Sequence, residues 1–152
     1  MSAIAGIINL DGAPLNLEIL SRMESAGISR GPEAVGRWVS NSEGFVFCGA
    51  EPFQAAEKQP FLDSESGVVV ILDGHIHARD ELSAACASGG YPVRTTAEAE
   101  LLVRAYQVWG EHCAEHILGE RAFAIWDPTL RRIVCARDDF GMRPFFYRYI
   151  PN

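Results

Sequence analysis

The chain has 152 residues, 48% of them hydrophobic, and a formal net charge of -7 at pH 7. This size and apolar content suffice for one domain with a sizeable core. Its 13 lysines and arginines are scattered, and no apolar run approaches the roughly 20 residues of a membrane-spanning helix. The N-terminus also lacks the pattern of a secretory signal. We therefore expect a cytoplasmic protein that binds neither nucleic acid nor membrane.

The first part of the chain predicts strands around a single helix. The opening segment AIAGII, followed by the turn signal Asp11-Gly12, is typical of a buried strand that begins almost at the N-terminus. Asn16 is a candidate N-cap for a helix over residues 16–26, which Gly27 and the following RGPEAVG segment are expected to end. RWVS and GFVFCGA then predict two paired strands, and residues 51–66 a polar loop.

The second part predicts more strands with helices between them. GVVVIL and FAIWD are the strongest strand signals, and we expect them to be the central strands of two antiparallel sheets. Residues 78–90 predict a short helix that ends on two glycines, and Thr95 or Thr96 is expected to cap a helix over 97–109. EHCAEHIL predicts another short helix, Asp127-Pro128 a hairpin turn, and FFYRYI a last strand. Strands and helices in this order favour an α+β fold.

Four cysteines are spread along the chain without the spacing of a zinc site. They are Cys48, Cys86, Cys113 and Cys135, each among apolar or small residues. We expect buried free thiols.

Seven segments together carry a family resemblance. In chain order they are MSAIAGI, RGPEAVG, QPF, LDGHIHARDEL, AEAELLVRAYQVWG, LGERAFAIWD and ARDDFGMRPFFY. The chain resembles the glutaminase domain of asparagine synthetases, a class II glutamine amidotransferase. The resemblance implies an N-terminal-nucleophile hydrolase fold, a four-layer sandwich in which helices cover two stacked antiparallel sheets. It makes residues 1–152 a single glutaminase-like domain and Arg137–Asp138 a structural turn.

The resemblance also implies a longer protein. The final FFYRYI lacks a hairpin partner after it, which favours the same view. A C-terminal synthetase domain, in cis or in trans, would then bind ATP and magnesium. The domain described by this sequence would itself hold no cofactor.

An active domain of this family uses an N-terminal cysteine as nucleophile and its own α-amine as base. An asparagine side chain and a glycine N–H form its oxyanion hole. The resemblance places Ser2 at the nucleophile and Asp73 with Gly74 at the oxyanion hole. A serine is a weaker nucleophile than a cysteine, and a carboxylate offers no N–H where negative charge develops. Both substitutions predict a degenerate catalytic site.

The glutamine pocket also departs from the family pattern. By resemblance His75 replaces a glutamate, Glu98 replaces an aspartate, and Glu51 falls near the arginine that binds the substrate carboxylate. With Asp73, these acidic groups predict a pocket that repels the α-carboxylate of glutamine. We expect Ser2 to lie with these residues in a site that is collapsed or filled by a contact between His75 and a carboxylate.

Loss of the catalytic groups predicts the kind of parent protein. Asparagine synthetase relatives that do not need ammonia include β-lactam synthetases, carbapenam synthetases and lasso-peptide cyclases. We expect a ligase of the lasso-peptide cyclase or β-lactam synthetase type, with a precursor peptide and a peptidase as possible partners.

Other functions remain open at this point. Ser2 could be an active nucleophile once Met1 is removed, the parent could be a synthetase that uses free ammonia, or the domain could be a stand-alone binding module. His75 and His77 alternate along a strand and could ligate a metal, but the spacing offers no third ligand. We therefore predict no metal site.

Overall fold

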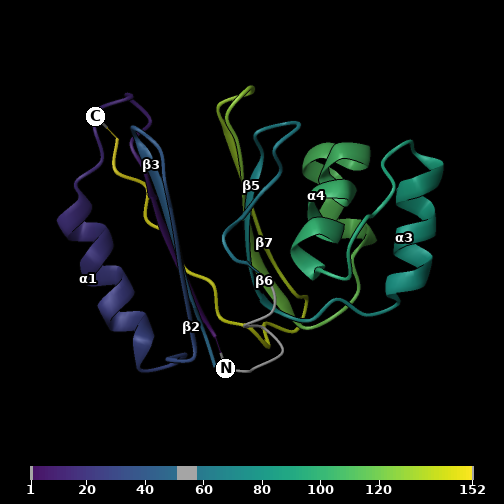
Figure 1. The fold of residues 1–152 in the computed structure, drawn as a ribbon, viewed down its shortest axis with the longest axis horizontal. Coiled ribbons are helices and arrows are strands. Elements are labelled where there is room, and N and C mark those ends of the chain that lie inside the picture. Colours follow the sequence, from purple (N-terminus) through teal and green to yellow (C-terminus); the bar gives the residue numbers. More distant parts are fainter. Residues whose placement is uncertain (1, 51–57, 152) are drawn as a thin grey trace. The chain divides into compact units, whose positions relative to one another are not determined.

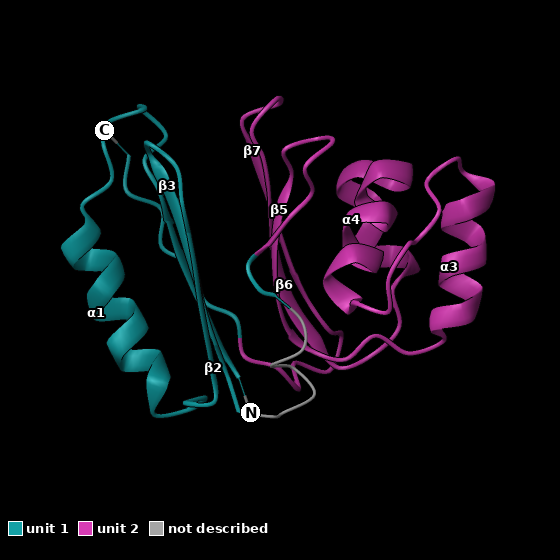
Figure 2. Cartoon of the chain, in the orientation of Figure 1, with its two compact units in different colours: residues 1–60, 145–152 teal, residues 61–144 magenta. Residues whose placement is uncertain are grey.

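The computed structural model describes residues 2–50 and 58–151, which form two compact units (Figures 1 and 2). Unit 1 comprises residues 1–60 and 145–152, and unit 2 comprises residues 61–144. Each unit contains one antiparallel sheet and its own helix or helices. This agrees with the predicted α+β class, whereas the stacking of the sheets in four layers stays a prediction. No helix in the described ranges is both long and apolar enough to span a membrane.

The sheet of unit 1 has the order β1-β3-β2, with strands β1 (Ala3–Ile8), β2 (Ala34–Val39) and β3 (Glu43–Gly49). The central strand β3 is buried along its whole length and pairs antiparallel with both neighbours. The predicted N-terminal strand is confirmed, because β1 is held in the sheet by this pairing. Strand β2 begins at Ala34, three residues before the predicted RWVS strand.

Helix α1 (Leu17–Ile28) packs against β1 and β3 through a face that includes the fully buried Leu20. The predicted cap is confirmed, since Asn16 Oδ1 accepts a hydrogen bond of 2.9 Å from Glu18 N. The prediction that Gly27 ends the helix is wrong. A Cβ at Gly27 would lie 2.9 Å from Cys48 Sγ, so this glycine instead lets the helix approach β3 closely.

The sheet of unit 2 has the order β4-β5-β6-β7 and is antiparallel throughout. Its strands are β4 (Phe61–Leu62), β5 (Val69–Gly74), β6 (Arg121–Asp127) and β7 (Arg132–Arg137). GVVVIL and FAIWD do form central strands, but they are neighbours in this one sheet rather than the centres of two sheets. Both are apolar along their length, and pairing with each other buries them together. The short strand β4 lies inside the segment predicted to be a loop.

Three helices belong to unit 2: α3 (Arg79–Ser88), α4 (Glu98–Trp109) and the 3-10 helix η1 (Gly110–His116). Helix α4 packs on β5, and α3 packs on α4 (Figure 1). The N-cap of α4 is Ala97 rather than a threonine. Thr95 nevertheless contributes, because its hydroxyl accepts a hydrogen bond of 3.2 Å from Ala97 N.

The predicted FFYRYI strand is wrong. Residues 145–150 adopt no regular secondary structure, and Phe146 is 89% exposed. A strand requires a neighbour for its backbone hydrogen bonds, and the described residues provide none for this segment.

The cysteine prediction holds for three of the four thiols. Cys48, Cys86 and Cys113 are free and buried, whereas Cys135 is free but exposed. Cys135 lies on β7, the last strand of its sheet, where exposure alternates with partial burial along the chain.

A buried ionic cluster joins α4 to the loop that follows β4. The Arg104 guanidinium lies 3.2 Å from Asp63 Oδ1 and 3.3 Å from Glu100 Oε1, and all three side chains are at most 6% exposed. Burial raises the pKa of Asp63, but hydrogen bonds from Ser66 and the charge of Arg104 outweigh it and hold this pKa below its usual range. Burial also raises the pKa of Glu100, but hydrogen bonds from Thr95, Arg94 and Arg104 outweigh this effect and hold the pKa below its usual range.

The ionic cluster yields a stability prediction. Arg104→Met should lower the free energy of unfolding by about 3–5 kcal/mol at pH 7, because it leaves two buried carboxylates without their cation. Since both pKa values are lowered, the wild type should lose stability as the pH falls below about 4, when these groups become protonated. The difference between variant and wild type should therefore shrink in acid. Urea denaturation at pH 7 and at about pH 3 measures both effects.

Arg94→Met is the matched control, because Arg94 pairs with Glu65 at 2.6 Å but both side chains are at least 60% exposed. Its denaturation midpoint should stay that of the wild type. Equal effects of the two substitutions would contradict a special role for the buried cluster.

Candidate functional site

Ser2, the predicted nucleophile position, immediately precedes β1 in unit 1. Its side chain is buried, with 2% exposure, and the adjacent Ala3 pairs with Cys48 of β3. The other described site residues belong to unit 2, so the expected convergence of Ser2 with them stays a prediction. Glu51 lies outside the described residues.

Asp73 and Gly74 are the last two residues of strand β5, directly after the GVVVIL run that predicts this strand. Asp73 is 8% exposed, and its Oδ1 lies 3.6 Å from a terminal nitrogen of Arg143. The same guanidinium donates a hydrogen bond of 3.3 Å to Glu120 Oε1. The carboxylate at the predicted oxyanion position is therefore paired with a cation, which the sequence reasoning did not foresee.

Arg143 is positioned by the turn that follows β7. Asp138 accepts hydrogen bonds from Met142 N at 2.8 Å and from Arg143 N at 3.1 Å. These backbone donors, Met142 first, hold the pKa of Asp138 below its usual range. The prediction of a structural turn here is confirmed for Asp138. Arg143 lies in the quoted ARDDFGMRPFFY segment, but nothing in its spacing signals a partner 70 residues earlier.

Two glycines bring the backbones of residues 74–77 and 118–121 close together. Gly74 has φ +119°, and a Cβ there would lie 1.9 Å from the carbonyl oxygen of Glu120. Gly119 has φ +132°, and a Cβ there would lie 2.1 Å from the carbonyl oxygen of His75. Hydrogen bonds from His75 N to Glu120 O at 2.9 Å and from His77 N to Leu118 O at 2.8 Å continue the pairing of β5 with β6.

Glu98, the first residue of α4, links the helix to the segment after β5. Its Oε1 accepts a hydrogen bond of 3.2 Å from Ile76 N, and its Oε2 lies 3.5 Å from His75 Nδ1. Arg79 also lies 3.8 Å from Oε1 and donates a hydrogen bond to the carbonyl of Thr96. The expected contact between His75 and a carboxylate is thus present.

The charges of this cluster correct one prediction. The sequence predicts an acidic site from Asp73, Glu98 and Glu51, of which Glu51 lies outside the described residues. Asp73 and Glu98 each have a guanidinium within 4 Å, so these two carboxylates are paired with cations. A paired carboxylate at position 73 accepts hydrogen bonds but has no N–H to donate.

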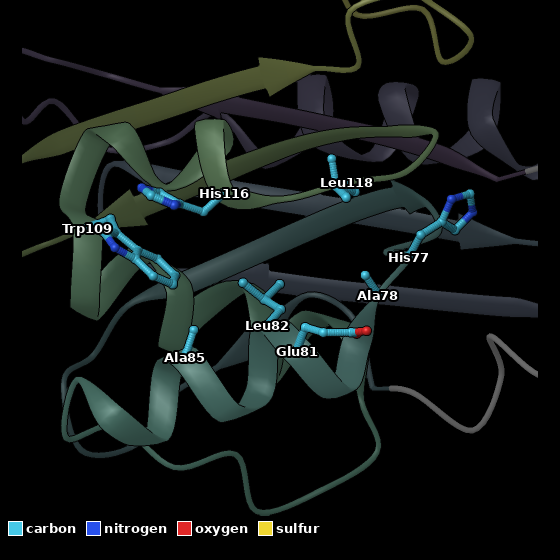
Figure 3. Close-up of a pocket in the computed structure, with 8 residues that line it drawn as sticks. All are labelled: His77, Ala78, Glu81, Leu82, Ala85, Trp109, His116 and Leu118. Atoms are coloured by element: carbon cyan, nitrogen blue, oxygen red, sulfur yellow. The ribbon is translucent and has the colours of Figure 1, made fainter.

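The two histidines predicted to alternate have different surroundings. His75 contacts Glu98, whereas His77 lines a groove with Trp109 and His116 (Figure 3). Within residues 2–50 and 58–151, no set of three or more histidine, cysteine, aspartate or glutamate side chains is arranged to hold a metal ion.

Comparison with known proteins identifies the class of domain. The family model described as "Glutamine amidotransferase domain" matches residues 1–152. The chain therefore belongs to the glutamine amidotransferase domain family.

Two curated relatives illustrate the similarity. The chain is 33% identical over 152 residues to asparagine synthetase (glutamine-hydrolyzing) 2 of Bacillus subtilis (strain 168), covering 97% of this chain and 20% of that protein. It is 27% identical over 127 residues to amidase chry2 of Gibberella zeae, covering 81% of this chain and 19% of that protein. The chain thus spans about a fifth of the length of these relatives.

A solved structure also matches. Glutamine phosphoribosylpyrophosphate amidotransferase of B. subtilis, complexed with ADP and GMP, aligns with a TM-score of 0.48 and 16% sequence identity. The alignment covers 82% of this chain and 29% of that one.

The close backbone approach at Gly74 yields a testable prediction. Gly74→Ala should lower the free energy of unfolding by about 3 kcal/mol or more, because the new methyl group meets a backbone carbonyl that cannot move without breaking the β5–β6 pairing. Thermal or chemical denaturation measures this loss.

Gly90→Ala is the control for backbone strain alone. Gly90 has φ +92° but nothing within 4 Å of its Cβ position, so we expect a loss of only about 1 kcal/mol. Indistinguishable losses at Gly74 and Gly90 would show that the close approach does not constrain the site.

Proposed function

We propose that this glutamine amidotransferase domain has lost glutamine hydrolysis. In this proposal it serves as a structural or substrate-supporting part of an asparagine synthetase-like ligase that forms amides with ATP. The observation that supports the proposal is the Asp73–Arg143 ion pair, because by resemblance residue 73 stands where this chemistry needs a hydrogen-bond donor.

Glutamine hydrolysis depends on hydrogen-bond donors at the oxyanion position. Attack on the glutamine amide puts negative charge on the carbonyl oxygen, and N–H donors must stabilise that charge. Losing one such donor typically costs about 2.7–4 kcal/mol of barrier, or a factor of 10² to 10³ in rate. A carboxylate at the same place adds repulsion to this loss. The Arg143 guanidinium is directed at Asp73 and Glu120.

The nucleophile position adds a second loss. By resemblance Ser2 stands where the family has cysteine. Neutral serine is much less nucleophilic than a thiol, a few per cent of which is thiolate at pH 7. Serine therefore depends more strongly on the oxyanion hole that Asp73 impairs.

The residue predicted to bind the α-amine of the substrate already has partners. By resemblance Glu98 would bind the α-amine of glutamine. Its carboxylate already contacts Ile76 N, His75 and Arg79, so a substrate ammonium would have to displace existing partners. These contacts support a site filled by the protein's own side chains.

The loss of ammonia production suggests a parent ligase whose substrate already carries the attacking amine. Lasso-peptide cyclases and β-lactam synthetases are of this type, and we assign the parent to it. A C-terminal synthetase domain, in cis or in trans, would bind ATP and magnesium, and a precursor peptide and a peptidase would be cytoplasmic partners. Release of pyrophosphate on adding candidate carboxylate substrates to the longer protein tests this assignment.

A second candidate function comes from the names of the relatives. The B. subtilis relative is named as glutamine-hydrolyzing and the G. zeae relative as an amidase. Active hydrolysis by Ser2, with its free α-amine as base, is therefore the alternative that an assay must separate from the proposal.

A glutamate-release assay separates the two. The chain, with loss of Met1 verified by mass spectrometry, should release no glutamate from glutamine above the buffer rate. Ser2→Ala should leave that result unchanged. Turnover that disappears in Ser2→Ala would refute the proposal and make Ser2 the nucleophile.

Restoration provides the positive control. The triple variant Ser2→Cys, Asp73→Asn, His75→Glu should gain measurable glutamine turnover, whereas each single substitution should not, because residues of one catalytic unit act together. Full activity from Ser2→Cys alone would show that Asp73 does not impair the oxyanion hole.

A further inference from the structure

Unit 2 carries a groove that the proposed function does not use (Figure 3). Its volume is about 190 Å³, and it lies between α3 and the segment from Trp109 to Leu118. Leu82 and Ala85 of α3 line one side, and Trp109 and Leu118 line the other. An apolar cavity of about 150 Å³ holds one benzene molecule, so this groove has room for one side chain of a partner.

The groove has an aromatic pair at one end and a carboxylate toward the other. Trp109 and His116 stack at one end, with ring centroids 4.2 Å apart and an interplanar angle of 15°. Figure 3 shows His77 at the opposite end and the Glu81 side chain reaching toward Ala78. A ligand lying along the groove would therefore contact an aromatic pair with one end and a carboxylate with the other.

The Glu81 carboxylate is uncompensated. It makes no hydrogen bond and no ion pair with any residue in the described part of the chain. Two arginines of neighbouring segments are engaged elsewhere: Arg79 with Glu98 and the Thr96 carbonyl, and Arg121 with the carbonyls of Gly119 and Ala114. The groove thus combines an apolar floor with one free negative charge.

We propose that this groove binds an arginine side chain of a partner peptide or protein. The methylene groups of the arginine would pack on Leu82 and Leu118, on the side of the groove that leads to Trp109. Its guanidinium would pair with Glu81, where a planar cation with several N–H donors fits a carboxylate well. The chain's net charge of -7 would attract a basic partner at longer range.

Matched small molecules test the charge requirement. Butylguanidinium, its uncharged analogue butylurea and the anion valerate are titrated separately at pH 8, where histidine side chains are generally neutral. Chemical shifts of the Trp109 indole N–H and the Leu82 amide report occupancy. Butylguanidinium should saturate both signals with a dissociation constant in the millimolar range and bind about three-fold or more tightly than butylurea.

Two variants test the assigned residue. Glu81→Gln should remove the preference of the groove for butylguanidinium over butylurea. Glu18→Gln, which removes another exposed glutamate from the first turn of a helix, should keep that preference. Superimposable amide spectra outside the substituted turns verify that both variants are folded.

Three outcomes would overturn the proposal. Equal affinity for butylguanidinium and butylurea would make the groove a purely apolar site, and tighter binding of valerate would make it an anion site. No shift of the Trp109 indole at about 50 mM butylguanidinium would show that the groove binds no such cation.

Discussion

The close approach of two backbone segments in unit 2 is the constraint on which the candidate site depends. Residues 75–77 and 118–120 pair beyond the ends of β5 and β6, and only glycine fits at positions 74 and 119. This pairing fixes the direction in which the chain leaves the sheet. It thereby places His75 where Glu98 of α4 can reach it. The register of β5, β6 and β7 places Asp73 beside the turn that carries Arg143. Backbone pairing thus determines where the side chains of the site lie.

Buried charge explains how the site departs from its family pattern. A carboxylate that is nearly withdrawn from water needs a cation or several donors. Asp73 has Arg143, and Glu98 has His75, Arg79 and the Ile76 N–H. By resemblance Asp73 stands at the oxyanion position, and its ion pair with Arg143 lets the fold accept a buried carboxylate there.

Local patterns predicted the parts of the fold that depend on local physics. The Asn16 cap follows from residue preference at helix N-termini, and the strand at GVVVIL follows from a short apolar run. FFYRYI has the same strand-like composition, but a strand also needs a partner, which composition does not reveal. The sequence predicts a helix end at Gly27, whereas the role of this glycine depends on its contact with Cys48 of β3. The guanidinium partners Arg79 and Arg143 were missed for the same reason, since ion pairing between distant segments leaves no spacing signal. Because of these two guanidinium partners, Asp73 and Glu98 are paired carboxylates rather than the unpaired acidic groups that the sequence predicts.

Glutamine binding is the most direct test of the central claim, that the site's own ion pairs occupy the place of the substrate. The unmodified chain is titrated with L-glutamine while the amide signals of Gly74 and Ile76 and the side-chain signals of His75 are followed. We predict no saturable chemical-shift change at millimolar glutamine, because Glu98 and Asp73 keep their present partners. Saturable shifts at these three residues, with D-glutamine giving none, would contradict it.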